Sequence, residues 1–183
     1  LADSTFEGDE SVTVTISNAS NASISDATAT LTITEDDTGP SLSINSVTTS
    51  DETAQNHTFT VSMSPTSASV VTVDYATSDG TASSADYTSA SGTLTFSAGV
   101  SSQTFTVAVK ADALDEANET VTVALSNASN ATIAAGSSST TLTITDDDAT
   151  PSLSINDATV AESAGSGSLT VTLSAASGRD VSF

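Results

Sequence analysis

Apolar and polar residues alternate along most of the chain. The letters V-T-V-T-I stand at 12–16, F-T-V-A-V at 105–109 and V-T-V-A-L at 121–125, and shorter or similar runs stand at 31–33, 59–63, 94–96 and 169–173. A period of two predicts β-strands that bury one face. Thr and Ser fill the outward positions, where β-branched Thr suits a pleated surface. No stretch has a convincing period of 3.6, so the pattern predicts an all-β protein.

The pattern also repeats over a long distance. The letters P-S-L-S-I-N stand at 40–45 and again at 151–156, an offset of 151 − 40 = 111, and S-N-A-S-N-A stands at 17–22 and 126–131, an offset of 109. A period this long is a whole domain. We therefore expect residues 1–39 to be the C-terminal part of a first repeat, 40–150 a complete repeat, and 151–183 the N-terminal part of a third. The end pieces are too short to bury a core alone, so we expect a window of a longer tandem array.

Seven strands are expected in the complete repeat, at 41–45, 57–63, 70–76, 92–96, 103–109, 120–126 and 138–145. Seven short strands in about 100 residues predict an immunoglobulin-like β-sandwich. If the strands run alternately up and down, the first, third and fifth connections lie at one pole together with the end of the last strand. All the loop acids of the repeat fall at that pole, whereas the opposite loops, 64–68, 97–101 and 126–136, carry none.

The charge of the chain makes this segregation informative. There are 23 Asp and Glu residues against two Lys and Arg, which gives a formal net charge of −21. Such a surface disfavours nucleic acid and anionic membranes as partners and favours cations. With no Cys and a single His, oxygen ligands point to Ca²⁺ rather than Zn²⁺ or copper. A solvated acidic surface with no bound ion is the plainer alternative.

Four short motifs together resemble the Calx-β domain, as found in bacterial extracellular adhesin-like proteins. They are D-Y-A-T-S-D-G-T-A at 74–82, A-D-Y at 85–87, D-x-x-x-E-x-x-E-T-V-T-V at 112–123 and L-T-I-T-D-D-D at 142–148. The resemblance covers 40–150 and the matching parts of the two end pieces. It implies a seven-stranded sandwich that binds Ca²⁺ at its C-terminal pole.

The resemblance also implies the metal ligands of each repeat. For the complete repeat they are Asp51 or Glu52, Asp86, Asp112, Glu116, Glu119, Asp146, Asp147 and Asp148; for the first repeat Asp3, Glu7, Glu10, Glu35, Asp36 and Asp37; for the third only Glu162. The family has a run of Asp where this chain has A-D-A at 111–113 and A-D-S at 2–4. Fewer carboxylates imply one or two ions per domain, with dissociation constants of about 10⁻⁴ to 10⁻³ M.

Two functions fit these features. The first is a segment of an extracellular stalk or filament, in which Ca²⁺ stiffens the joints between repeats and the partners are neighbouring repeats or like chains in a fibre. The second is a calcium-sensing regulatory module, a role that Calx-β domains also have in ion exchangers. No pairing of a nucleophile with a base is visible, so we expect no enzyme. We expect neither nucleic-acid binding nor membrane insertion of this segment.

Overall fold

The computed structural model describes residues 5–48 and 51–183, and over these residues the chain forms strands and no helix. The prediction of an all-β protein is confirmed. The strands are β1 Glu10–Thr15, β2 Thr28–Ile33, β3 Ser41–Ile44, β4 Val47–Thr48, β5 Asn56–Ser64, β6 Val71–Asp79, β7 Tyr87–Thr88, β8 Ser91–Phe96, β9 Ser102–Val109, β10 Glu119–Ser129, β11 Thr132–Ile133, β12 Ser139–Ile144, β13 Leu153–Ile155 and β14 Val171–Leu173. No described segment has a helix that could cross a membrane.

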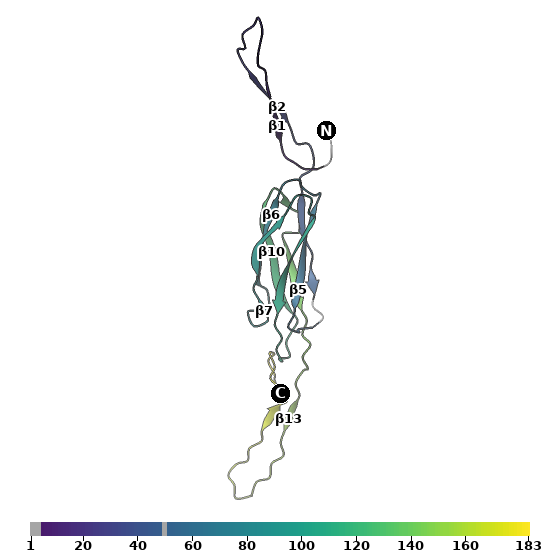
Figure 1. Cartoon of the computed structure of the whole chain (residues 1–183). Helices are drawn as coiled ribbons and strands as arrows, with labels where there is room; N and C mark the ends of the chain where they lie inside the picture. The colour runs from purple at the N-terminus through teal and green to yellow at the C-terminus, as the bar shows by residue number, and fades with distance from the viewer. Residues whose placement is uncertain (1–4, 49–50) are drawn as a thin grey trace.

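The middle of the chain is a sandwich of two five-stranded sheets (Figure 1). One sheet has the order β4-β12-β10-β6-β8 and the other β11-β3-β5-β9-β7. The seven strands expected from the sequence correspond to β3, β5, β6, β8, β9, β10 and β12. The two-residue strands β4, β7 and β11 were not expected, because two residues carry too little pattern to recognise.

The inward positions of the alternating strands form one core between the sheets. Phe59 and Val61 of β5 and Val121 and Val123 of β10 are all fully buried. Burial of a side chain of this size contributes about 1.5–3 kcal/mol. Tyr75 closes one side of the core, where its ring stacks on Phe105 with 3.9 Å between centroids. The alternation of the sequence therefore positions the sheets, and the sheets position the loops.

The repeated S-N-A-S-N-A segment forms the same backbone turn in two places. Asn127 and Asn130 have φ angles of 50° and 58°, and their counterparts Asn18 and Asn21 both have 55°. Asn tolerates this left-handed region better than most residues. In the sandwich, Asn127 Nδ2 also donates to Asp74 Oδ2 at 3.0 Å. The two identical sequence segments thus also share a backbone conformation.

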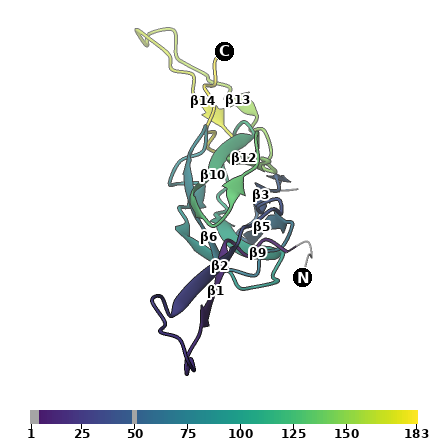
Figure 2. The same ribbon diagram turned by 90° about the horizontal axis from the view of Figure 1, so that it is seen from above.

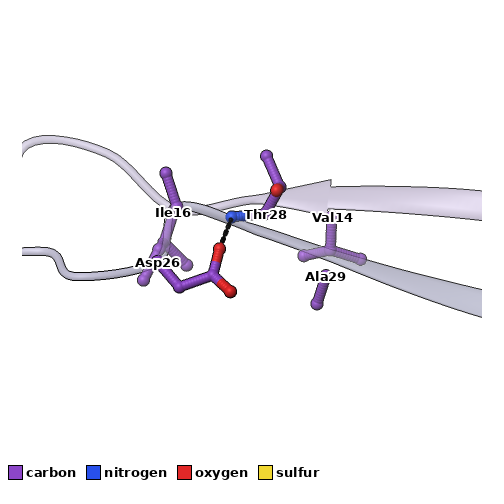
Figure 3. A pocket seen from close by; sticks show the side chains of 6 residues that line it. Val14, Ile16, Asp26, Thr28 and Ala29 are labelled. Carbon is purple, nitrogen blue, oxygen red and sulfur yellow. Dashed lines mark hydrogen bonds between the residues drawn. The ribbon is translucent and has the colours of Figure 1, made fainter.

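Two hairpins leave the sandwich at opposite ends, and the molecule is elongated in both views (Figures 1 and 2). β1 pairs with β2 at the N-terminal end, and β13 pairs with β14 at the C-terminal end. Their apolar faces are open to solvent: Leu31 is 61% exposed, whereas Leu142, its counterpart at an offset of 111, is fully buried. Figure 3 shows this open face on the first hairpin, where Val14, Ile16 and Ala29 lie beside Asp26, whose Oδ1 accepts from the Thr28 amide at 3.1 Å.

Candidate metal centre

Acidic side chains from four separate segments converge at one end of the sandwich. Glu52 follows β4, Asp86 precedes β7, Asp112 and Glu116 follow β9, and Asp146 and Asp148 follow β12. We call these six residues the acidic pole. It lies at the end labelled β7 in Figure 1, which faces the hairpin of β13 and β14. Up-and-down strand order therefore brings together acids that are almost 100 positions apart in the chain.

The acidic pole contains two overlapping groups of carboxylates. Glu52, Asp86, Asp112 and Glu116 can each place one oxygen within 4.8 Å of the others, and so can Glu52, Asp146 and Asp148. Glu52 belongs to both groups. Carboxylate oxygens at this spacing are the ligands that Ca²⁺ prefers, so the two groups could hold two neighbouring ions that share Glu52.

Hydrogen bonds from backbone amides fix the direction of two of these carboxylates. Asp86 Oδ2 accepts from the amide of Ser83 at 2.6 Å and from its hydroxyl at 3.0 Å. Asp146 Oδ1 accepts from the Glu116 amide at 3.1 Å, which ties the end of β12 to the loop after β9. The Asp146 amide in turn donates to Asn118 Oδ1 at 3.2 Å. A local turn at Asp86 and long-range bonds at Asp146 therefore preorganise these two acids before any ion binds.

Burial and mutual repulsion oppose the negative charge of the pole. Glu52 is 3% exposed, and its Oε2 atom is buried with no hydrogen-bond partner in the described part of the chain. Burial, followed by the negative charges of Asp112, Glu116, Asp146 and Asp86, raises the pKa of Glu52 to about 7. A buried acceptor without a partner costs about 1–3 kcal/mol. A cation in contact with Glu52 would remove both penalties.

Glu119 repeats this situation at the start of β10. Its Oε2 atom is also buried without a hydrogen-bond partner among the described residues. Burial and then Asp86, Glu116 and Glu52 raise its pKa to about 7. Burial and neighbouring acids likewise raise the pKa of Glu116 and of Asp148. Glu119 lies outside the two close groups but in the same electrostatic environment.

The structure distinguishes among the acids that the sequence could not separate. Of the alternatives Asp51 and Glu52, only Glu52 belongs to the close groups, whereas Asp51 accepts from the Thr53 hydroxyl at 2.6 Å within its own turn. In the D-D-D triplet, Asp146 and Asp148 belong to a close group, and Asp147 is exposed and belongs to neither.

A smaller group made of Glu35, Asp36 and Asp37 lies between β2 and β3. Glu35 Oε2 accepts from the amides of Glu7 and Gly8 at 2.5 and 2.7 Å, and Oε1 accepts from the Asp37 amide at 2.8 Å. These hydrogen bonds lower the pKa of Glu35, and the bond from the Asp37 amide has the largest effect. Its carboxylate is therefore already stabilised as an anion by backbone amides.

The remaining candidate ligands that the structure describes are not gathered into a close group. Among the described residues, the side chains of Glu7, Glu10 and Glu162 belong to no group of three or more such ligands; Glu10 lies on β1 opposite Ile33, and Glu162 lies in an exposed turn. Asp3 lies outside the described residues.

One functional contact was not expected from the sequence. Arg179, which follows β14, lies with its guanidinium 3.8 Å from Asp115 Oδ1 and 3.9 Å from Asp146 Oδ2. Asp115, which is not among the ligands expected from the sequence, is 5% exposed. The only signal in the sequence was the rarity of cations, since Arg179 is one of two. Its position against the pole depends on how the second hairpin meets the sandwich.

The chain is similar to several known proteins. The family model of the Calx-beta domain matches residues 35–148. The crystal structure of the apo-form Calx CBD1 domain is 27% identical with a TM-score of 0.55, over 61% of this chain and 100% of that one. CBD12 of CALX1.1, described as a calcium binding domain, is 28% identical with a TM-score of 0.56, over 68% of this chain and 54% of that one. CBD12 from CALX1.2 is also 28% identical, with a TM-score of 0.56, over 59% of this chain and 46% of that one.

The chain thus spans about half the length of the two CBD12 structures. No curated protein matches by sequence.

Proposed function

Because the chain belongs to the Calx-beta domain family, we propose that the acidic pole binds Ca²⁺ and that the bound ions stiffen the joint between successive repeats. The segment would then be part of a long extracellular stalk or filament that holds a distal region away from a microbial cell surface. Its partners would be the neighbouring repeats of its own chain, with like chains in a fibre as a further possibility. The role is mechanical and involves no catalysis.

The observation that carries the ion-binding part is the position of Glu52. Its carboxylate belongs to both close groups, is almost fully buried, and has one oxygen without a hydrogen-bond partner in the described chain. Burial of an acid among other acids is unfavourable unless a cation is also present. The similarity to a crystal structure described as a calcium binding domain supports Ca²⁺ as that cation.

The position of the pole supports the mechanical part. Asp146 and Asp148 follow the last strand of the sandwich, and Pro151 follows only three residues later. Ions bound to these acids would therefore fix the segment that leads into the next repeat. Pro151 restricts the first backbone angle of that segment further.

Thermal unfolding of the full chain in EDTA and in a Ca²⁺ titration tests the proposed function. Ligand linkage predicts stabilisation by about 2.7 kcal/mol per site at a hundredfold excess over the dissociation constant. We expect a midpoint between about 0.1 and 1 mM, as in extracellular modules. The absence of any shift, with Mg²⁺ and Na⁺ equally without effect, would show that the pole is only a solvated acidic surface.

The second candidate is a calcium-sensing regulatory module. The structural similarity to CBD1 and CBD12 of Calx favours it. A sensor must respond at about 10⁻⁷ to 10⁻⁵ M, so the midpoint of the same titration separates the two functions. The weaker binding expected for this chain rests on the A-D-A sequence at 111–113, which supplies one carboxylate.

A further inference from the structure

Each hairpin contacts the sandwich through the same kind of backbone contact. We call the contact of the β1–β2 hairpin with the sandwich the first joint, and that of the β13–β14 hairpin the second joint. At the first joint, Phe6 forms a parallel β-bridge with Ser67, and the Ala68 amide donates to the Phe6 carbonyl at 3.2 Å. At the second joint, Asp115 forms a parallel β-bridge with Ser177, and the Gly178 amide donates to the Asp115 carbonyl at 3.1 Å. In the first contact the segment before β1 meets the turn after β5, and in the second the segment before β10 meets the turn after β14.

The residues of the two contacts are equivalent in the repeat. Asp115 and Phe6 differ by 115 − 6 = 109, the offset of the S-N-A-S-N-A segments. The segments F-T-V-S-M-S-P-T-S-A at 59–68 and L-T-V-T-L-S-A-A-S-G at 169–178 align at 110, which pairs Ser67 with Ser177. Two joints with different side chains thus have one backbone geometry, which a chance contact would not reproduce.

The side chains give the two joints different chemistry. At the first joint the Phe6 ring covers Gly39, where a Cβ atom would stand 3.6 Å from ring atom Cε2. At the second joint Arg179 faces the carboxylates of Asp115 and Asp146 and donates to the Glu116 carbonyl. The equivalent of Arg179 at the first joint, 179 − 110 = 69, is a serine.

The second joint also has tight packing next to the pole. A Cβ atom at Gly178 would stand 2.5 Å from Cγ of Glu116, so only glycine allows this approach without a shift. The Ser177 hydroxyl donates to the Asp115 carbonyl at 3.4 Å, and the Thr150 hydroxyl donates to Asp115 Oδ1 at 3.3 Å. The linker and the following turn therefore hold the same loop.

We propose that each repeat docks on the preceding one through this backbone contact without a metal ion. The side chain at the equivalent positions Phe6 and Asp115 then determines whether the joint is aromatic, as at Phe6, or ionic, as at Asp115. The surface formed by residues 115–116 and 146 is thus an interaction site whose partner is the turn 177–179 of the following repeat. The proposal rests on the proposed function only in treating 1–39 and 151–183 as parts of repeats.

Amide hydrogen exchange of the full chain in EDTA tests the docking, because the Ala68 and Gly178 amides are the donors of the two contacts. We expect both amides to exchange at least about tenfold more slowly than unprotected amides. Arg179→Gln should speed exchange at Gly178 by roughly two- to fivefold and leave Ala68 unchanged. Phe6→Ala should speed exchange at Ala68 and leave Gly178 unchanged. Arg179→Lys keeps the charge and should retain part of the protection.

Lys110→Gln is the matched control, because it removes the other of the two Lys and Arg residues, whose Nζ donates to the Ser84 carbonyl and not to a residue of either backbone contact. It should alter neither amide. Unprotected exchange at Gly178 in EDTA with protection only after Ca²⁺ is added would overturn the docking proposal and leave the proposed function intact. Protection in EDTA with no response to Ca²⁺ anywhere would support docking and contradict the proposed function.

Discussion

Burial and charge oppose each other at Glu52, and this conflict gives the residue its importance. The side chain points into a cluster of like charges, where ionisation is unfavourable. Charged groups buried in proteins are normally paired or bound to a metal. Glu52 is therefore the single residue whose replacement should separate the stability of the free protein from its response to Ca²⁺.

Glu52→Gln tests this separation. The amide keeps the shape of the side chain and removes one charge, so we expect the protein in EDTA at pH 7.5 to be more stable by about 1–3 kcal/mol. Most of the stabilisation by Ca²⁺ should be lost, because both groups share this carboxylate. Urea unfolding with and without Ca²⁺ measures both effects.

Asp147→Asn serves as the control for this substitution. It makes the same change of charge at an exposed residue between Asp146 and Asp148 of the pole, and it should shift both quantities by less than about 0.5 kcal/mol. An equal loss of the calcium response in Asp147→Asn would refute the assignment of the two groups.

The raised pKa values of Glu52 and Glu119 predict a pH dependence of stability. Both rise from 4.5 to about 7 in the folded state, so the folded protein binds more protons than the unfolded chain between these values. The free energy of unfolding in EDTA should therefore fall as pH rises from about 5 to about 7.5. Saturating Ca²⁺ should abolish this fall, because it favours the ionised carboxylates.

His57 acts in the opposite direction. Burial lowers its pKa from 6.5, so its contribution to stability increases as pH rises through that region. The effect is the same with and without Ca²⁺, and the difference between the two curves isolates the carboxylates. Urea unfolding at pH 5.0, 6.0 and 7.5 provides the measurement, and parallel curves in EDTA and Ca²⁺ would contradict the prediction.

At the scale of elements, one strand pattern has two different packing outcomes. The sequence L-T-I occurs in β2 and in β12, but the β2 face is open and the β12 face is covered by the opposite sheet. Alternation predicts a strand with an apolar face, and only the neighbouring elements decide whether that face is buried.

Leu142→Ala and Leu31→Ala make this difference measurable. Leu142 is fully buried, so its truncation should lower the free energy of unfolding of the sandwich by about 2–5 kcal/mol. Leu31 is 61% exposed in the equivalent position, and its truncation should change the same quantity by less than about 0.5 kcal/mol. Similar losses in both variants would show that the first hairpin has a covered core of its own in solution.

At the scale of the whole molecule, the two joints set how the elongated chain responds to its surroundings. The Arg179 side chain is 53% exposed, so salt can screen its attraction to the buried carboxylate of Asp115, whereas the contact of Phe6 with Gly39 involves no charge. The ionic second joint and the aromatic first joint should therefore differ in their sensitivity to salt.

Pairs of spin labels across each joint test this difference, and the lack of Cys in the chain makes such labelling specific. In EDTA, 1 M NaCl should broaden the distance distribution between labels at Thr106→Cys and Thr172→Cys, because the screening length falls from about 10 Å at 0.1 M to about 3 Å. The distribution between Thr13→Cys and Thr58→Cys should stay unchanged. Equal broadening at both joints would contradict the assignment of their chemistry.

The sequence by itself determined the strand content, the two-residue period of the faces and the concentration of acids in loops at one pole. These features follow from local alternation and strand order, which a single sequence records directly. The repeated S-N-A-S-N-A segment was recognised from the sequence, and the left-handed backbone of its asparagines is a local property of those residues.

Only the tertiary structure decided which acids form the close groups. Asp147 and Asp148 are neighbours in the same motif, but the course of the chain after β12 directs only Asp148 toward Glu52. Likewise, nothing local marks Arg179 as a partner of Asp115, because 64 positions separate them and the contact of the second hairpin with the sandwich brings them together. Distances between side chains depend on loop paths and joint geometry, and these arise from packing over the whole molecule rather than from any short stretch of sequence.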